Sequence, residues 1–532
     1  MKMMGGTWTS NTNNRQLMSR KHGGFNGACY TCGRLGHRAA DCGVNDQMIK
    51  RRWCDVCKKN NHDTKWCRRK DSVMTLDNSQ NDVKGRPVQE IVSSMRFHMK
   101  RPGRALIFVF TCTAFILALM YRTSFYGETG ALHPFFDPKD SQRYAGCHYL
   151  HGQAQSIFSL EDTVQAWQKA STCRGLYKKF SAIYRVSTAT SDVVVKEPFL
   201  AKVQSWLPGV PQDQFQRQKI ISVLNKYTYE QSIINPTRSK RPGITARVDL
   251  DNYINDLVEK SSKNCDFCQY SENTAENSFG RIESKYTYTA ANVFPFDGFH
   301  GVIIFKNHHP LHFTLDEFLD AMSVARRWMK RAHGENSNYK YPHLTWDCLP
   351  KGSTSQVHSH AQVTLNSISH YGQMQLLTSA ALKFEKDFPG ESYFQTLFEI
   401  HRGLNLSVCL GDAKAFTLIT PKKDDDIFVI AQKPTKDFYS LLYHVLRAYI
   451  DEMKLYAWSM VIFFPTLDSF GSWDEGSIPV VARLISRGPP DIQRSDISSL
   501  ELFAASNVNT DPFKVIPSIK KSLRQDGIDS QC

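Results

Sequence analysis

The longest apolar segment of the chain covers residues 105–121 (ALIFVFTCTAFILALMY), which carry no charged side chain. Its length reaches the lower limit for a helix that crosses a bilayer, roughly 17–25 residues. Lys100, Arg101 and Arg104 precede the segment, and Arg122 follows it. Because basic residues favour the cytosolic side, we expect an uncleaved single-pass anchor with a cytosolic N-terminus and a large domain in the lumen of the endoplasmic reticulum or Golgi. The alternative is a buried core helix.

Farther along the chain, residues 291–318 (ANVFPFDGFHGVIIFKNHHPLHFTLDEF) contain a hydrophobic strand pattern and then the start of a helix. Thr314 and Glu317 have the spacing of a capping box, in which each side chain bonds a backbone N–H at the helix start. Apolar residues then recur with helical spacing, which predicts a helix with one buried face. That face consists of Phe318, Met322, Ala325 and Met329.

Residues 352–366 (GSTSQVHSHAQVTLN) combine a small-residue loop with a strand pattern. Alternate residues of a strand share a face, so His358, His360 and Gln362 should point one way. A loop of small residues can offer backbone N–H groups to phosphate oxygens, and an imidazole can attack phosphorus and leave again. His-x-His also occurs in metal sites and in ordinary polar strands, so the spacing alone leaves these functions open. The opposite face would carry Val357, Ser359, Ala361 and Val363.

Changes in composition divide the chain into successive regions, with no internal repeat beyond the motifs at 29–67. Met95 begins a short basic tail followed by the apolar segment, which is how a single-pass protein of the secretory pathway usually begins. Residues 1–94 are therefore either a fused module or a product of gene prediction, and the sequence leaves both open. We expect a disordered basic tail at 1–28, paired Cys/His motifs at 29–67, a basic linker at 68–104, the anchor at 105–121, a stem and the first part of the large domain at 122–239, one half-domain at 240–370 and a second at 371–520.

The net charge of +15 is concentrated before the anchor. Residues 1–104 hold 21 Lys and Arg against 8 Asp and Glu, whereas the rest of the chain holds 45 against 43. Such asymmetry favours a polyanionic partner for the N-terminal arm, either nucleic acid or an anionic membrane surface. A solvated tail is the alternative.

Two Cys/His motifs of identical spacing, C-x2-C-x4-H-x4-C, lie within the basic arm. Three thiolates and one imidazole satisfy tetrahedral zinc, and a peptide this short has no other core, so the metal would supply its folding energy. We therefore predict two zinc knuckles. Their ligands are Cys29, Cys32, His37 and Cys42 in the first and Cys54, Cys57, His62 and Cys67 in the second. Elsewhere only Cys265 and Cys268 are closely spaced, so a disulfide-dense scaffold is not expected.

These motifs resemble the CCHC knuckles of retroviral and retrotransposon nucleocapsid proteins, which implies binding of single-stranded nucleic acid. Tyr30, Trp53 and Trp66 are candidate stacking platforms. The second motif lacks the glycines usual in that family, and protein binding is the alternative. Basic side chains are supplied by Arg34, Arg38, Lys50, Arg51, Arg52, Lys58, Lys59, Arg68 and Arg69.

The large domain resembles the galactose-1-phosphate uridylyltransferase branch of the histidine-triad superfamily. The resemblance is carried by Cys265-x2-Cys268, by the strand and helix of residues 291–318, and by His358-x-His360-x-Gln362, in the same order as in that family. It is clear over about 240–370 and faint beyond. It implies an α+β fold with two related halves and antiparallel sheets, and it leaves a homodimer open.

By position, the resemblance implies that His360 is the nucleophile that becomes nucleotidylated and that Gln362 bonds the phosphoryl oxygen. Asp347 and Ser355 would contact the phosphates or sugar of the nucleotide. A zinc ion that is mainly structural would also be held. Its implied ligands are Cys265, Cys268, His309 and His358, with His308 as the rival of His309.

Three departures from the family pattern affect the substrate more than the chemistry. Ser359 stands where the family has Pro, and Asp347 stands where it has Asn. Residues 478–488 (IPVVARLISRG) take the place of a His-rich strand, and Arg483 and Arg487 there either bind phosphate or are surface charges. We expect nucleotidyl transfer from a nucleoside diphosphate sugar or related nucleotide to a sugar phosphate or to phosphate. The alternatives are a non-catalytic nucleotide-binding homologue and a nucleic-acid-binding protein of retroelement origin.

Overall fold

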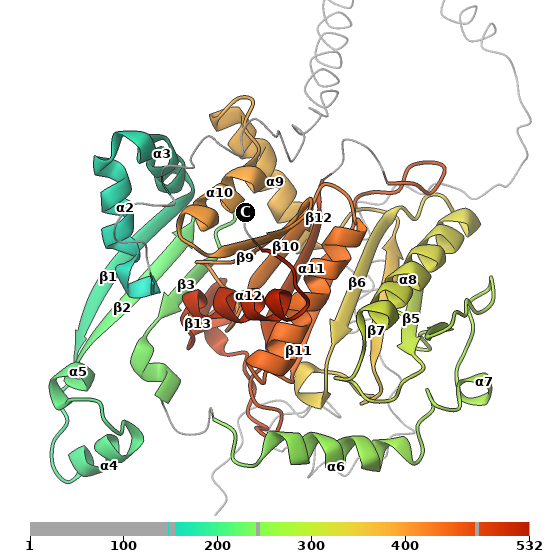
Figure 1. The fold of residues 1–532 in the computed structure, drawn as a ribbon, viewed down its shortest axis with the longest axis horizontal. Coiled ribbons are helices and arrows are strands. Elements are labelled where there is room, and N and C mark those ends of the chain that lie inside the picture. The colour runs from blue at the N-terminus through green and yellow to red at the C-terminus, as the bar shows by residue number, and fades with distance from the viewer. Residues whose placement is uncertain (1–146, 148–154, 241–244, 474–477, 531) are drawn as a thin grey trace, which may run out of the picture. The chain divides into compact units, whose positions relative to one another are not determined.

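Figure 1 shows the computed structural model of the chain, which describes residues 147, 155–240, 245–473, 478–530 and 532. The chain divides into two compact units, Met1–Met120 and Tyr121–Cys532, and all described residues belong to the second. The predicted knuckles at 29–67, the linker at 68–104 and the anchor at 105–121 lie outside the described residues. Within the described ranges, no helix is both long and apolar enough to cross a bilayer.

A nine-stranded sheet, antiparallel throughout, forms the centre of the described unit (Figure 1). Its strand order is β4-β5-β7-β6-β11-β12-β10-β9-β8, so β6 and β11 join two halves of similar construction. Each half runs strand, strand, helix, strand, strand along the chain: β4, β5, α8, β6, β7 and then β9, β10, α11, β11, β12. The strands are β4 (Thr287–Ala291), β5 (Phe299–Phe305), β6 (Tyr341–Asp347), β7 (His360–Asn366), β8 (Ser407–Leu410), β9 (Ala413–Thr417), β10 (Ile427–Ala431), β11 (Trp458–Phe463) and β12 (Val480–Ser486).

Two helices, α8 (Leu315–Glu335) and α11 (Lys436–Arg447), cover one face of this sheet (Figure 1). The capping box predicted for α8 is confirmed, since the Thr314 and Glu317 side chains each bond the other's backbone N–H. The predicted apolar face is confirmed as well, because its four residues are 0–2% exposed. Thr435 caps α11 through the N–H of Phe438. A threonine N-cap therefore starts both of these helices, and α12 (Val515–Gln525) adds Val515, Ile516, Ile519 and Leu523 to the same core.

The opposite face of the sheet is covered differently in the two halves, and in the first half, among the described residues, only a small cluster under Phe267 and Tyr270 lies on it. A four-stranded sheet of order β1-β2-β3-β13 and several helices pack onto the second half, forming a core shared with β10 and β12. The elements are β1 (Tyr184–Asp192), β2 (Arg217–Asn225), β3 (Gln231–Ile234), β13 (Ala505–Val508), α2 (Leu160–Lys169), α3 (Arg174–Ile183), α9 (Gly372–Asp387) and α10 (Tyr393–Gly403). The remaining α-helices are α4 (Phe199–Trp206), α5 (Gln212–Gln216), α6 (Leu250–Ser262), α7 (Tyr270–Asn273) and α12 (Val515–Gln525).

Strand register places one row of side chains across all nine strands, on the face away from α8 and α11. Gln362 of β7 and Arg483 of β12 both belong to this row, separated by Thr345 and Val461. From β4 to β8 the row is Ala290, Val302, Gln362, Thr345, Val461, Arg483, Phe428, Phe416 and Ser407.

Two disulfides close the described unit, Cys147–Cys173 and Cys409–Cys532. Their Cα atoms are 5.3 and 5.1 Å apart, within the range that a disulfide requires. The two cysteines of each disulfide are 26 and 123 residues apart in the chain, respectively. The spacing of the cysteines in the sequence did not predict either pair.

Candidate active site and metal centre

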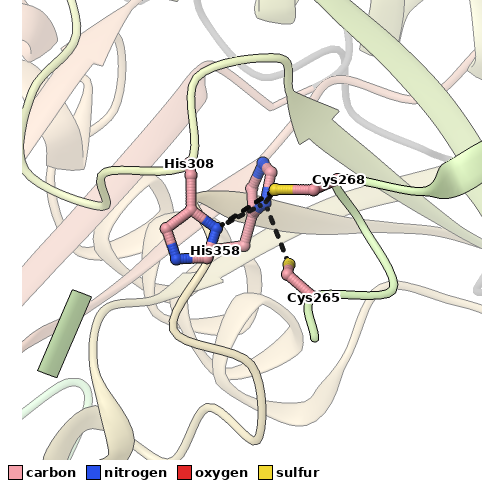
Figure 2. Close-up of side chains that lie close together, drawn as sticks. All are labelled: Cys265, Cys268, His308 and His358. Atoms are coloured by element: carbon pink, nitrogen blue, oxygen red, sulfur yellow. Dashed lines mark hydrogen bonds between the residues drawn. The ribbon is translucent and has the colours of Figure 1, made fainter. Parts of the chain in front are cut away.

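Four side chains of metal-ligating types converge where β5 ends and β7 begins (Figure 2). Cys265 and Cys268 lie in the turn between α6 and α7, His308 follows β5, and His358 lies two residues before the start of β7. One ligand atom from each lies within 4.8 Å of all the others. His358 Nδ1 is 3.3 Å from Cys265 Sγ, 3.5 Å from Cys268 Sγ and 3.2 Å from His308 Nδ1.

Hydrogen bonds outside the cluster orient both imidazoles toward it. His358 Nε2 lies 2.6 Å from the carbonyl oxygen of Phe305, to which it must donate, so Nδ1 keeps its lone pair. Ser261 Oγ donates to the carbonyl of Val258 and lies 3.0 Å from His308 Nε2, from which it can accept. His308 Nδ1 therefore also faces the cluster with a lone pair. Such outer bonds are the usual support of metal-binding histidines.

The donor set suits zinc. Two thiolates and two imidazoles are a common tetrahedral set, and zinc bonds of about 2.0–2.3 Å place neighbouring ligand atoms roughly 3.3–3.8 Å apart. Without a cation, desolvation and the neighbouring Cys265 raise the pKa of Cys268 to about 11. A divalent ion would remove that penalty, because it stabilises both thiolates.

His309 does not belong to this cluster, so its implied role as a ligand is wrong and its rival His308 takes the place. The His309 ring instead stacks on His312, with centroids 3.5 Å apart and planes within 7°. Its backbone N–H donates to Asn307 Oδ1, and its Nδ1 accepts from the N–H of Leu311. The turn after β5 thus directs the two adjacent histidines to different sides.

A pocket of about 380 Å³ lies beside the metal centre, on the face of the sheet away from α8. It brings together four residues that the sequence resemblance implied for catalysis or nucleotide contact: His360, Gln362, Asp347 and Ser355. The loop after η12 (Pro350–Gly352) forms one wall. His358 does not share this face, because it lies before the strand begins and points into the metal centre.

His360 presents one ring nitrogen to the pocket with a lone pair. Its Nδ1 lies 2.7 Å from the carbonyl oxygen of His358 and must donate to it, which leaves Nε2 unprotonated in the neutral ring. Thr354 Oγ1 is 3.5 Å from Nε2 but donates to the carbonyl of Gln356. Burial lowers the pKa of His360, while its bond to the His358 carbonyl acts in the other direction. His360 is therefore neutral near pH 7.

Gln362 is held by two residues that the sequence did not single out, Asn292 and His300. Asn292 Nδ2 donates to Gln362 Oε1 at 3.1 Å, and His300 Nε2 lies 2.9 Å from the same oxygen. Both residues lie in the segment 291–318, but a lone Asn and a lone His carry no periodic signal. Only the pairing of β5 with β7 brings them to Gln362.

Asp347 carries a carboxyl group into the pocket where the resembled family has an amide. Burial raises the pKa of Asp347, and a hydrogen bond from Ser459 and the charge of Arg487 partly offset that rise. Arg487 is itself held by Asp496, and its Nη1 donates to Ser459 Oγ at 2.9 Å and to the carbonyl of Gly352 at 3.1 Å. Arg487 thus supports the pocket wall from behind.

Arg483, predicted as a phosphate ligand or a surface charge, is neither. It is 6% exposed and forms ion pairs with Asp426 and Glu230, each at 2.6 Å. These carboxylates raise the pKa of Arg483 although burial opposes them. Its role is to neutralise two acidic groups between the two sheets, and it does not line the pocket that contains His360.

Comparisons with known proteins find two separate likenesses. The zinc knuckle family matches residues 27–43, which contain the first predicted knuckle. No curated protein matches the sequence. Among solved structures, an ADP-glucose phosphorylase from Arabidopsis thaliana is 12% identical with a TM-score of 0.41, covering 56% of this chain and 97% of its own. A uridylyltransferase is 13% identical with a TM-score of 0.40, covering 46% and 90%.

A yeast Ap4A phosphorylase is also matched, with 11% identity, a TM-score of 0.25 and coverage of 62% and 97%. These matches are structures of the same group of enzymes that the sequence motifs resemble. With TM-scores below 0.5, they add nothing about substrate or reaction. We therefore base the function of this chain on the side chains of the pocket.

Proposed function

We propose that the large domain transfers nucleotidyl groups through a covalent intermediate on His360. One observation carries the proposal: the His360 Nδ1–H is held by the His358 carbonyl, so that a neutral Nε2 faces a pocket. An imidazole fixed in this tautomer is a nucleophile that needs no separate base. The metal centre supports it, because His358 is both a ligand-type residue and the source of that carbonyl.

Two displacements complete the reaction. The Nε2 lone pair attacks the α-phosphorus of a nucleoside diphosphate compound, forming an N–P bond while the bond from phosphorus to the bridging oxygen breaks. The leaving phosphate departs with that electron pair. A phosphate oxygen of the acceptor then attacks the same phosphorus, and the N–P bond returns its electrons to Nε2. The proton on Nδ1 stays with the ring throughout.

The loop at Ser355 and Gln356 suits the phosphates of such a substrate. Within the described residues, the backbone N–H groups of Ser355 and Gln356 donate no hydrogen bond. Both residues line the pocket with His360. Free N–H groups in a loop form an anion-binding concavity, so this wall of the pocket can hold phosphate oxygens.

Labelling the intermediate tests this proposal. The full chain would be incubated with ADP-glucose, a UDP-sugar and Ap4A, each labelled at the α-phosphorus, and the protein examined for label that acid releases and base does not. We expect labelling in the wild type and none in His360→Gly. The control is His312→Gln, an exposed histidine outside the pocket. Normal turnover in His360→Gly would overturn the proposal, and nucleotide binding without any labelling would favour the non-catalytic homologue.

For the N-terminal arm, we propose that the matched knuckle binds zinc and then single-stranded nucleic acid. The match over residues 27–43 supports the zinc site, and the basic and aromatic side chains of the arm supply the charge and stacking that such binding needs. Titration of the full chain with a fluorescent single-stranded oligonucleotide should show salt-sensitive binding that Cys29→Ser weakens. Unchanged binding in that variant would show that the first knuckle does not bind the oligonucleotide.

We also propose that residues 105–121 anchor the protein and that the large domain lies in the lumen. The two disulfides support this location, because disulfides persist in oxidising compartments. Asn405-Leu-Ser407 provides a test, since Asn405 is exposed between α10 and β8. A lumenal domain expressed in eukaryotic cells should lose a glycan from Asn405 on treatment with an amidase, and Asn405→Gln should abolish that shift. Complete digestion of the domain by protease added to sealed microsomes would contradict the orientation.

A further inference from the structure

Backbone N–H groups fix the orientation of the Gln362 amide indirectly, through the side chains of Asn292 and His300. The N–H of Phe294 donates to Asn292 Oδ1 at 2.9 Å, which identifies that atom as the oxygen. The Asn292 atom that faces Gln362 must then be the nitrogen. Because this nitrogen donates, the Gln362 atom 3.1 Å away must be the acceptor Oε1.

His300 imposes the same direction independently. The N–H of Phe296 donates to His300 Nδ1 at 3.4 Å, so the proton of the neutral ring lies on Nε2. That nitrogen lies 2.9 Å from Gln362 Oε1, to which it donates, and 3.2 Å from Asn292 Nδ2, the other donor to the same oxygen. His300 is 3% exposed, with the Phe296 ring 4.2 Å from its own. Burial lowers the pKa of His300, which keeps the ring neutral.

Strand register explains why these three side chains meet. Val302 of β5 lies opposite Gln362 of β7, and His300 lies two residues before Val302 on the same face. Asn292 continues the pairing of β4, since its N–H donates to the carbonyl of His300. A shift of one residue would turn Gln362 to the face covered by α8.

We propose that Asn292 and His300 are positioning residues that hold Gln362 by its carbonyl oxygen and so turn its amide N–H groups toward a phosphoryl group on His360. This rests on the proposed function. Because both Asn292 and His300 donate to Oε1, the flipped amide is excluded: it would place the Gln362 NH₂ group against their N–H groups. Within the described residues, Gln362 Nε2 has no hydrogen-bond partner, and Gln362 lines the same pocket as His360. Asn292 and His300, which we call the clamp, therefore make Gln362 present a hydrogen-bond donor to the pocket.

Substitutions of the clamp test its direction. His300→Phe removes one donor and should lower the transfer rate about 10-fold, the effect of one hydrogen bond. Asn292→Asp should cost more, about 100-fold, because the new carboxylate oxygen repels Oε1 and pulls the amide into the flipped orientation. In a Gln362→Ala background neither change should lower the rate further. The control is Thr364→Val, which is buried opposite His300 and bonds Tyr371 rather than Gln362.

A readout without substrate separates this inference from the reaction. The side-chain amide signal of Gln362 in ¹⁵N-glutamine-labelled protein, assigned by its absence in Gln362→Ala, should move in His300→Phe and Asn292→Asp but not in Thr364→Val. If this holds and the wild type is never labelled, the nucleotidyl transfer is wrong and the clamp stands. If both substitutions leave the signal unchanged, or lower the rate equally with and without Gln362, the clamp is overturned.

Discussion

Gln362 in the first half of the nine-stranded sheet and Arg483 in the second occupy matching places in one row and on one face. Gln362 lines a pocket of about 380 Å³. Arg483 is 6% exposed and is neutralised by Asp426 and by Glu230, which lies just before β3. Both halves have the same order of strands and helices. The covering elements differ: the small sheet packs on the second half, whereas in the first half Phe267 and Tyr270 cover part of this face and a pocket remains at Gln362.

The difference shows that a polar side chain on a sheet face acquires its role from what covers that face. A buried arginine needs carboxylate partners, and it then stabilises the join between two sheets. An uncovered glutamine remains available to a ligand. In this protein the same architecture supports a stabilising ion cluster in one half and a candidate active site in the other.

The largest predicted effect concerns the metal centre of the first half. The described residues of the second half contain no equivalent cluster. His308→Ala should remove one zinc ion per chain and destabilise the first half, since bound zinc supplies folding energy. His309→Ala should retain the full zinc content, because that ring stacks on His312 instead. Elemental analysis of purified variants checks this, and equal zinc loss in both would contradict the ligand assignment.

Arg483→Met should lower the free energy of unfolding by about 3–5 kcal/mol, because it leaves Asp426 and Glu230 buried without their cation. The rate of transfer per folded molecule should not change, since Arg483 does not line the pocket of His360. Denaturant titration and kinetics on the same samples measure the two effects. A variant that kept its stability but lost turnover would place Arg483 in the active site after all.

Gln362→Ala should show the opposite behaviour. Loss of a donor that meets developing charge lowers a rate roughly 10²–10³-fold. The free energy of unfolding should fall by only about 1–3 kcal/mol, because His300 and Asn292 lose the oxygen to which they donate. Thr345→Val, the next residue in the same row, also lines the pocket and serves as the matched control. A large stability loss with unchanged turnover would show that Gln362 is a structural residue like Arg483.

The last effect appears only in acid and concerns two buried histidines near the join, His343 on β6 and His370. Burial lowers the pKa of His343 to about 3 and that of His370 to about 4, below the ordinary 6.5. The unfolded chain therefore binds protons below pH 6.5 that the folded chain does not. Stability should be full above that pH and fall toward pH 4 by on the order of 1 kcal/mol per pH unit and group. Urea midpoints at several pH values should show a flatter dependence in His370→Gln, and an unchanged slope would exclude that residue.

Several features follow from short-range patterns and were correctly predicted on that basis. The capping box at Thr314 and Glu317 needs only residues three apart, and the buried face of α8 needs only helical periodicity. Strand alternation likewise placed His360 and Gln362 together. It failed for His358, because the strand starts two residues later than the pattern suggested.

Sequence alone thus determined the start and buried face of α8, the shared face of His360 and Gln362, and the spacing of the first knuckle, because each depends on neighbours within a few positions. Tertiary structure alone decided between His308 and His309, which differ by one position in a turn. It also decided the burial of Arg483, the partners of the disulfides, and the approach of Asn292 and His300 to Gln362. These depend on strand register and on which face a second sheet covers, and such contacts join residues up to 253 positions apart, as in the pair of Arg483 with Glu230.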